Sequence, residues 1–347
     1  MVEWRPILRA YARSYVLPPL SWLTLRNSKH GNSRMTTLHT PTSPDQIHRN
    51  TTTMPVSIAR KRVPVECPVC GPHSSQPFGI SNDLNIVRCG GCSMLRVSER
   101  PSEEDVADFY RDEYISHEDR AEEEMISYRE GSLQREARRL RRLVPRGGRL
   151  LDIGAATGSF LSQFNGHADW KVKGVEPSGF AVEYARQRFG LQIHHGFLGD
   201  QSFADETFDV VTSLDTLMLH PYPADDVGEM ARILKPGGLL AVEIPGLTFR
   251  LLKQTGPVSK LIYGDGCRLN AGVHLYFFIR KTLTQMVARH GFAPVQSWPE
   301  SAPVYGGSLT RAGKWMFYQT TRAMYHVSGR LIHLAPKEFI VFRKQVA

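Results

Sequence analysis

The sequence predicts an α/β fold in which a Rossmann-like, largely parallel sheet follows a small cysteine-rich module. Apolar runs such as residues 150–153 alternate with helical patterns. A glycine-rich turn at 154–158 follows that run, and four cysteines stand in two C-x-x-C pairs before residue 93. Buried parallel strands are continuous apolar runs joined by helical crossovers, so the main sheet is expected to be parallel.

The turn at 154–158 is typical of a nucleoside site. Glycines let a ligand approach the backbone, and a helix expected over 157–164 would present its N–H groups to that ligand. Glu176 ends the next apolar run, where a carboxylate can accept hydrogen bonds from ribose hydroxyls. Candidate cofactor-binding residues are Asp152, Gly154, Ala155, Ala156, Gly158, Glu176 and, after the fourth strand, Asp215.

The following segments continue the α/β alternation. A strand over 208–215 precedes apolar residues at helical spacing, and a breaker turn at 235–238 precedes a strand over 239–244. We expect a sixth strand at 293–298 and a last one at 339–343. The aromatic insertion between them, 308–327, is interpreted as core or dimer contact.

The turn reads G-x-x-x-G, with Ala156 where a dinucleotide fingerprint has its second glycine. With F-D-V-V at 208–211, L-K-P-G-G at 234–238 and H-L-Y-F-F at 274–278, it makes residues 146–295 resemble class I S-adenosylmethionine-dependent methyltransferases. The resemblance implies a seven-stranded sheet with an antiparallel last strand, S-adenosylmethionine as cofactor, and methyl transfer.

Cys67 and Cys70, eighteen intervening residues, then Cys89 and Cys92 have the spacing of a zinc ribbon. Four thiolates leave no open coordination position, so a bound zinc would be structural. Unrelated or disulfide-paired cysteines are the alternative. A ribbon ahead of the methyltransferase region resembles bacterial sugar and secondary-metabolite methyltransferases, and also some ribosomal RNA methyltransferases.

The net charge of +9 is concentrated at the start of the chain. Residues 1–62 carry ten Lys and Arg against two acidic residues and so account for +8 of it. This tail is expected to be disordered. It is an extension upstream of the true start (Met35 or Met54), a basic organellar presequence, or a surface-binding arm, and we favour the first. No apolar run is long enough to span a membrane, and the composition fits a soluble, cytoplasmic enzyme.

We therefore divide the chain into the tail 1–62, a zinc ribbon at 63–98, a helical linker at 99–145 and a methyltransferase domain at 146–347 with a lid at 246–273. The linker is rich in arginine at positions Arg135, Arg138, Arg139, Arg141 and Arg142. These side chains could bind phosphate, of RNA or of a nucleotide sugar. We favour the alternative, a solvated helix face paired with nearby glutamates.

Methyl transfer needs an in-line acceptor and, for some acceptors, a general base. Candidate catalytic residues are His274, His220, Tyr222 and Tyr276. With Asp215 they are expected to line an acceptor site between the fourth strand and the lid. We favour His274 because it opens the motif that ends the lid, whereas His220 is one position away from the histidine of many relatives.

The resulting hypothesis is methyl transfer from S-adenosylmethionine to a small-molecule or sugar-linked acceptor. The alternative is a ribosomal or transfer RNA methyltransferase that grips RNA with the ribbon and the arginine helix. A third is a non-enzymatic ribbon module with a degenerate methyltransferase fold. The nearly neutral body of the chain favours the first, so no nucleic-acid partner is expected, while a homodimer stays open.

Overall fold

The computed structural model describes residues 62–82, 84–105, 121–252, 269, 271, 274–301 and 308–346, without the side chains of 121–128 and 308–311. The basic tail up to residue 61, most of the predicted lid and Cys267 lie outside these residues. Among the described helices, none combines the length and apolarity needed to cross a membrane.

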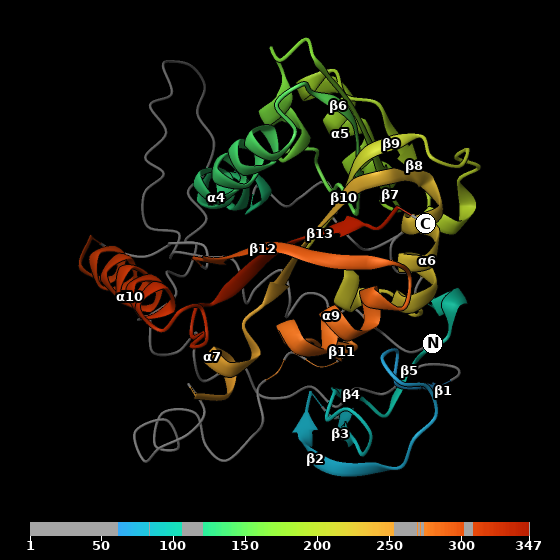
Figure 1. Ribbon diagram of the computed structural model, residues 1–347, viewed down its shortest axis with the longest axis vertical. Coiled ribbons are helices and arrows are strands. Elements are labelled where there is room, and N and C mark those ends of the chain that lie inside the picture. Colours follow the sequence, from blue (N-terminus) through green and yellow to red (C-terminus); the bar gives the residue numbers. More distant parts are fainter. Residues whose placement is uncertain are drawn as a thin grey trace, which may run out of the picture.

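The main sheet has seven strands in the order β12-β13-β10-β9-β6-β7-β8 (Figure 1). Their bounds are Gly148–Ile153 (β6), Trp170–Glu176 (β7), Ile193–His195 (β8), Phe208–Leu214 (β9), Leu234–Pro245 (β10), Phe292–Glu300 (β12) and Lys337–Lys344 (β13). Strands β6 to β10 pair in parallel, and β13 runs antiparallel to β10 and β12. The prediction of a Rossmann-like sheet with an antiparallel last strand is confirmed.

Helices pack on both faces of this sheet. One face is covered by α4 (Ala121–Leu143), the 3₁₀ turn η1 (Leu161–Phe164) and α5 (Gly179–Phe189), and the other by α6 (Pro223–Ile233) and α9 (Arg280–Ala288). The apolar stripe of α4 is buried, as its spacing predicts. Two further helices, α7 (Leu247–Leu252) and α10 (Ser308–Val327), lie beyond the sheet at the lower left of Figure 1.

The prediction of a helix over 157–164 is wrong. Turns lead from the glycine loop to η1, which begins only at Leu161. Gly158 has a left-handed φ of 77°, and the side chains of Ser162 and Gln163 donate to the carbonyl of Ser159. Such local bonds compete with helix formation, so the cofactor loop presents turn amides instead of a helix N-terminus.

The arginines of α4 are used inside the protein. Arg135 and Arg139 both pair with Glu300, a fully buried carboxylate at the end of β12. Arg141 donates to the carbonyl of Gln163 and lies over the ring of Phe164. For these three residues the expectation of a solvated face paired with nearby glutamates is wrong, because their partners come from distant segments.

The cysteine-rich module consists of two small antiparallel sheets and is joined to the main domain. Its strands are Arg62–Pro64 (β1), Ser75–Ser81 (β2), Leu84–Cys89 (β3), Leu95–Val97 (β4) and Glu99–Pro101 (β5). β1 pairs with β5, while β2, β3 and β4 are extended by β11 (Tyr276–Phe277) from the far side of the predicted lid. The core of the module is continuous with that of the main domain.

Candidate functional site

The loop after β6 is shaped by its glycines. Gly154 has a φ of 72°, and a Cβ atom there would lie 2.4 Å from Cγ2 of Thr216. At Gly158 a Cβ atom would lie 2.6 Å from Cδ1 of Leu191. Both positions therefore need glycine. Ala156, where related loops carry the middle glycine, is also left-handed at φ 46°, a conformation that costs an alanine about 1–2 kcal/mol.

Glu176 ties this loop to the end of β7. One carboxylate oxygen accepts a hydrogen bond from the backbone N–H of Ala156 at 2.8 Å, and the other accepts from Ser178 at 2.9 Å. The side chain is buried, and this burial raises its pKa to about 7 although both amide bonds lower it. Each oxygen keeps a second acceptor position, as recognition of a ribose diol requires.

Two further carboxylates stand at the ends of neighbouring strands. Asp152 accepts a hydrogen bond of 2.6 Å from Thr212, and burial raises its pKa to about 7. Asp215 follows β9 in a left-handed conformation and pairs with Lys337 and Arg129. Burial alone would raise the pKa of Asp215, but the two cations outweigh it and lower the pKa to about 2.

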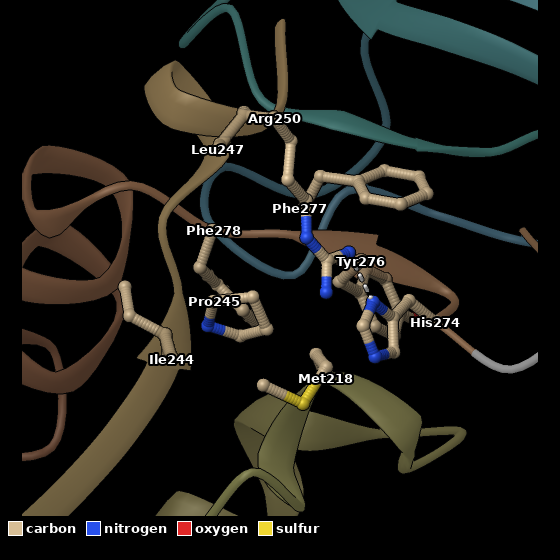
Figure 2. Close-up of a pocket in the computed structure, with 9 residues that line it drawn as sticks. All are labelled: Met218, Ile244, Pro245, Leu247, Arg250, His274, Tyr276, Phe277 and Phe278. Carbon is tan, nitrogen blue, oxygen red and sulfur yellow. Dashed lines mark hydrogen bonds between the residues drawn. The ribbon is translucent and has the colours of Figure 1, made fainter. Parts of the chain in front are cut away.

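Beyond β9 and β10, a small cavity of about 10 Å³, the room that one water molecule needs, lies between η3 (Leu217–Leu219), α7 and β11 (Figure 2). Its lining is mostly apolar: Met218, Ile244, Pro245, Leu247, Phe277 and Phe278, with Arg250, His274 and Tyr276 as polar members. Of the five side chains expected to line an acceptor site, the structure brings His274 and Tyr276 together here.

His274 is held by Arg250. Figure 2 shows Arg250 extending from α7 so that its guanidinium meets the imidazole, and Nη1 lies 2.8 Å from Nδ1 of His274. Because a guanidinium only donates, Nδ1 accepts and the imidazole carries its proton on Nε2. Burial and the Arg250 charge hold the pKa of His274 well below its usual range, so the ring is neutral at pH 7.

In His220 the Nδ1 atom has the opposite hydrogen-bonding role to Nδ1 of His274, donating instead of accepting. Nδ1 of His220 lies 2.6 Å from a carboxylate oxygen of Asp226, in the first turn of α6. A carboxylate accepts, so Nδ1 carries a proton, and in the neutral form of the ring the lone pair lies on Nε2.

The two tyrosines lie apart. Tyr276 donates to the carbonyl of Pro221 at 2.9 Å, whereas Tyr222 is 50% exposed and stacks under the guanidinium of Arg100. Neither hydroxyl group is therefore a free acid or base inside the cavity, and both side chains brace the segment that carries His220.

The four cysteines converge as their spacing predicts. Sγ of Cys67 lies 3.5 Å from that of Cys92 and 3.6 Å from that of Cys70, and the Cys70–Cys89 distance is 3.4 Å. Four thiolates bound tetrahedrally at about 2.3 Å from a zinc ion are about 3.8 Å apart, so this cluster fits the metal. Burial would raise the pKa of Cys89, but backbone N–H groups of Cys92 and Gly91 outweigh it and lower the pKa to about 6.

Backbone hydrogen bonds connect the cysteine module to the cavity. Val97 on β4 donates to the carbonyl of Leu275, and Leu275 donates to that of Met218 in η3. The segment carrying His274 and Tyr276 is thus held between the module and the loop after β9.

Sequence reasoning missed several residues of the site. Arg250 carries no local signal, since it lies in a segment read only as a lid. Asp226 could have been found, because it lies six residues after His220 and just inside a helix that begins with Pro223. The ion pairs of Arg129, Glu243 and Lys337 around Asp215 join residues 86 to 122 positions apart, beyond any sequence pattern.

Comparison with known proteins agrees with this geometry. The family model described as a methyltransferase domain matches residues 125–297. The O-methyltransferase cnsE of Penicillium expansum is 31% identical over 109 residues, which are 29% of this chain and 40% of that protein. Erythromycin 3''-O-methyltransferase of Saccharopolyspora erythraea is 31% identical over 166 residues, 44% of this chain and 53% of that protein. The chain thus spans about half or less of these two relatives.

A solved structure of phosphoethanolamine N-methyltransferase 2 from Haemonchus contortus, in complex with S-adenosyl-L-methionine, has a TM-score of 0.44 at 15% identity. The match covers 72% of this chain and 63% of that one. The strand order, the glycine loop beside Glu176 and the matched family model lead to one assignment. Residues 125–297, with β13 completing their sheet, belong to a class I S-adenosylmethionine-dependent methyltransferase domain.

Proposed function

We propose that this protein transfers a methyl group from S-adenosylmethionine to a small-molecule or sugar-linked acceptor. The observation that carries the proposal is Glu176, whose two oxygens are aligned by backbone N–H groups, one of them in the glycine loop. A carboxylate oriented in this way binds a ribose diol without further rearrangement. Asp152, Ala155 and the loop glycines complete the adenosine side of the site.

The methyl group would then point beyond the ends of β9 and β10, toward the apolar cavity. The cavity has room for about one water molecule, so its side chains have to move apart to admit the reacting end of an acceptor. Its apolar walls exclude water from a sulfonium that reacts by in-line displacement. The name of one relative, erythromycin 3''-O-methyltransferase, gives a small molecule as its acceptor, which supports this substrate class.

The two histidines take complementary roles in this proposal. His220 offers a lone pair on Nε2, supported by Asp226, and is the proton acceptor when the acceptor atom is a hydroxyl oxygen. His274 offers an N–H on Nε2, fixed by Arg250, and orients the acceptor as a hydrogen-bond donor. This reverses the preference of the sequence for His274 as the base, while keeping it at the acceptor. Asp226 and Arg250 are positioning residues.

The cysteine module would bind one structural zinc through Cys67, Cys70, Cys89 and Cys92. The Sγ distances of 3.4–3.6 Å support a closed tetrahedral site without an open position for catalysis. Metal-binding thiolates persist in a reducing compartment, in keeping with the cytoplasmic location that we propose.

RNA as the acceptor receives no support from α4. Arg135 and Arg139 are committed to Glu300 and would have to abandon a buried carboxylate to reach phosphate. We therefore retain only the small-molecule hypothesis for the acceptor.

The test combines binding and transfer. Calorimetry should detect one bound S-adenosylmethionine per chain and no binding of NADH. Labelled methyl groups should pass from S-adenosylmethionine to components of a small-molecule extract, and Asp226→Asn should slow the transfer at least tenfold without weakening cofactor binding. Asp225→Asn, one position earlier in the same helical turn, is the matched control. NADH binding would contradict the cofactor assignment, and transfer only to RNA would contradict the acceptor class.

A further inference from the structure

Helix α10 exposes an apolar surface. Tyr318, Thr321 and Tyr325 form its buried side, and the hydroxyls of Tyr318 and Tyr325 bond to the backbone of β12. The opposite side is open, and α10 lies at the left edge of the molecule in Figure 1.

The open side carries large apolar side chains at helical spacing. Met316, Met324 and Val327 recur at i, i+8 and i+11 and are 63%, 39% and 89% exposed. The turn that follows the helix adds Leu331, which is 87% exposed, and Ile332. We call these five residues, with Trp315 and Phe317, the α10 patch. A contiguous patch of this kind marks an interaction surface.

The charge around the patch has one sign. Residues 302–336 contain no Asp or Glu, while Arg322, His326 and Arg330 are exposed beside the patch. Met, Trp and Phe bordered by cations are typical of helices that lie in the interface of an anionic membrane. A second copy fits poorly, since a twofold contact would bring these cations together.

We propose that α10 docks the protein on an anionic lipid surface. The helix axis would lie parallel to the membrane, with the α10 patch among the acyl chains and Arg322 and Arg330 among the headgroups. No described helix can span a bilayer, so the contact is peripheral. Phe317 also contacts Phe249 of α7, the helix that supplies Leu247 and Arg250 to the cavity. The docked surface therefore adjoins the acceptor site, but the docking itself does not depend on methyl transfer.

The test uses the full chain with two vesicle compositions, phosphatidylcholine alone and phosphatidylcholine with phosphatidylserine. Sedimentation measures binding, and amide hydrogen exchange locates it. We expect phosphatidylserine vesicles to sediment the protein and to slow exchange over 308–332. The variant Met316→Glu/Met324→Glu/Val327→Glu should bind these vesicles at least tenfold more weakly. Ile80→Glu, at a 61% exposed position on β2, is the matched control and should bind as the wild type does.

The double variant Arg322→Gln/Arg330→Gln tests the contribution of the cations to vesicle binding and leaves the apolar side intact. It should weaken binding and reduce its dependence on salt. Three results would overturn the proposal. Vesicle binding that is unchanged in both variants would place the contact elsewhere, the basic first 61 residues being the obvious source. If exchange over 308–332 becomes slower as the protein concentration is raised in the absence of vesicles, the surface binds a second copy of the protein instead of a membrane. A protein that fails to bind phosphatidylserine vesicles would leave α10 without this partner.

Discussion

Lowering the pH from 8 to 6 should weaken S-adenosylmethionine binding about tenfold through the carboxyl group of Glu176. Burial raises its pKa to about 7, as it does that of Asp152, which accepts a hydrogen bond from Thr212. A ribose diol donates two hydrogen bonds and so prefers the ionised carboxylate. Binding should therefore strengthen as the pH rises through 7, the sign expected when the ligand selects the deprotonated form.

The magnitude follows from the fraction ionised. With a pKa of about 7, about one Glu176 in eleven is ionised at pH 6 and about ten in eleven at pH 8, which makes the affinities differ about tenfold. This corresponds to about 1.4 kcal/mol of binding free energy. The backbone N–H groups of Ala156 and Ser178 keep the carboxylate in place at both pH values, so geometry should contribute little to the difference.

Calorimetry across this pH range, on the wild type and on Glu176→Gln, measures the effect. The amino group of the ligand also titrates near pH 8, but it does so equally with both proteins. The ratio of the two affinities therefore isolates Glu176, and it should change about tenfold. Glu183→Gln, at an exposed carboxylate on α5, serves as the matched control and should follow the wild type. A wild-type to Glu176→Gln ratio that stays constant from pH 6 to 8 would refute the reasoning.

Three further predictions concern the loop, the buried charges and the cysteine module. Gly154→Ala should lower cofactor affinity at least tenfold, because its Cβ atom would lie 2.4 Å from Thr216, while Ala156→Gly should bind normally in the same calorimetric assay. Burial and the Glu243 carboxylate raise the pKa of Glu136 well above its usual range, so the folded state favours the protonated carboxyl group. The free energy of unfolding therefore falls as the pH rises above the usual range of a glutamate, and in urea unfolding at pH 8 Glu136→Gln should be at least as stable as the wild type. Cys89→Ser should lose zinc in elemental analysis and slow turnover at least tenfold while cofactor affinity stays within twofold; full zinc content in this variant would contradict the ligand set.

Most of the main sheet could be predicted because its longer strands carry their own signals, whereas the three-residue β8 was not located. Strands buried on both faces, such as β6 and β9, are apolar runs. The breaker turn expected at 235–238 is wrong, because β10 begins at Leu234 directly after α6 and takes up these residues as an irregularity in its pairing with β9. The turn after β6 could also be predicted, since Gly154 and Gly158 adopt left-handed backbone conformations that favour glycine. The helix expected after that turn failed, because Ser162 and Gln163 satisfy the local backbone in a way that helix propensity does not register.

The parts of the site that could not be predicted depend on partners far away in the chain. Arg139 looks like a surface residue in sequence, yet it pairs with Glu300, 161 positions later. Arg250 acquires its meaning only from His274, 24 positions later across the predicted lid. His220 is the contrasting case, since its partner Asp226 is close in the sequence. A histidine shortly before a helix whose first turn is acidic could have been predicted to pair with a carboxylate, which would have favoured His220 as the candidate base.

The cysteine module supports from behind the segment that lines the cavity. Its strand β4 pairs with β11, and Leu275 is bonded on one side to Val97 and on the other to Met218. Displacing the module would therefore remove the partner of the strand that carries Tyr276 and loosen the segment that carries His274. The adenosine side is held differently, since Glu176 is fixed by Ala156 and Ser178. A metal in the module would thus stabilise the acceptor half of the site and leave the cofactor half unaffected, so metal loss and cofactor binding should be separable.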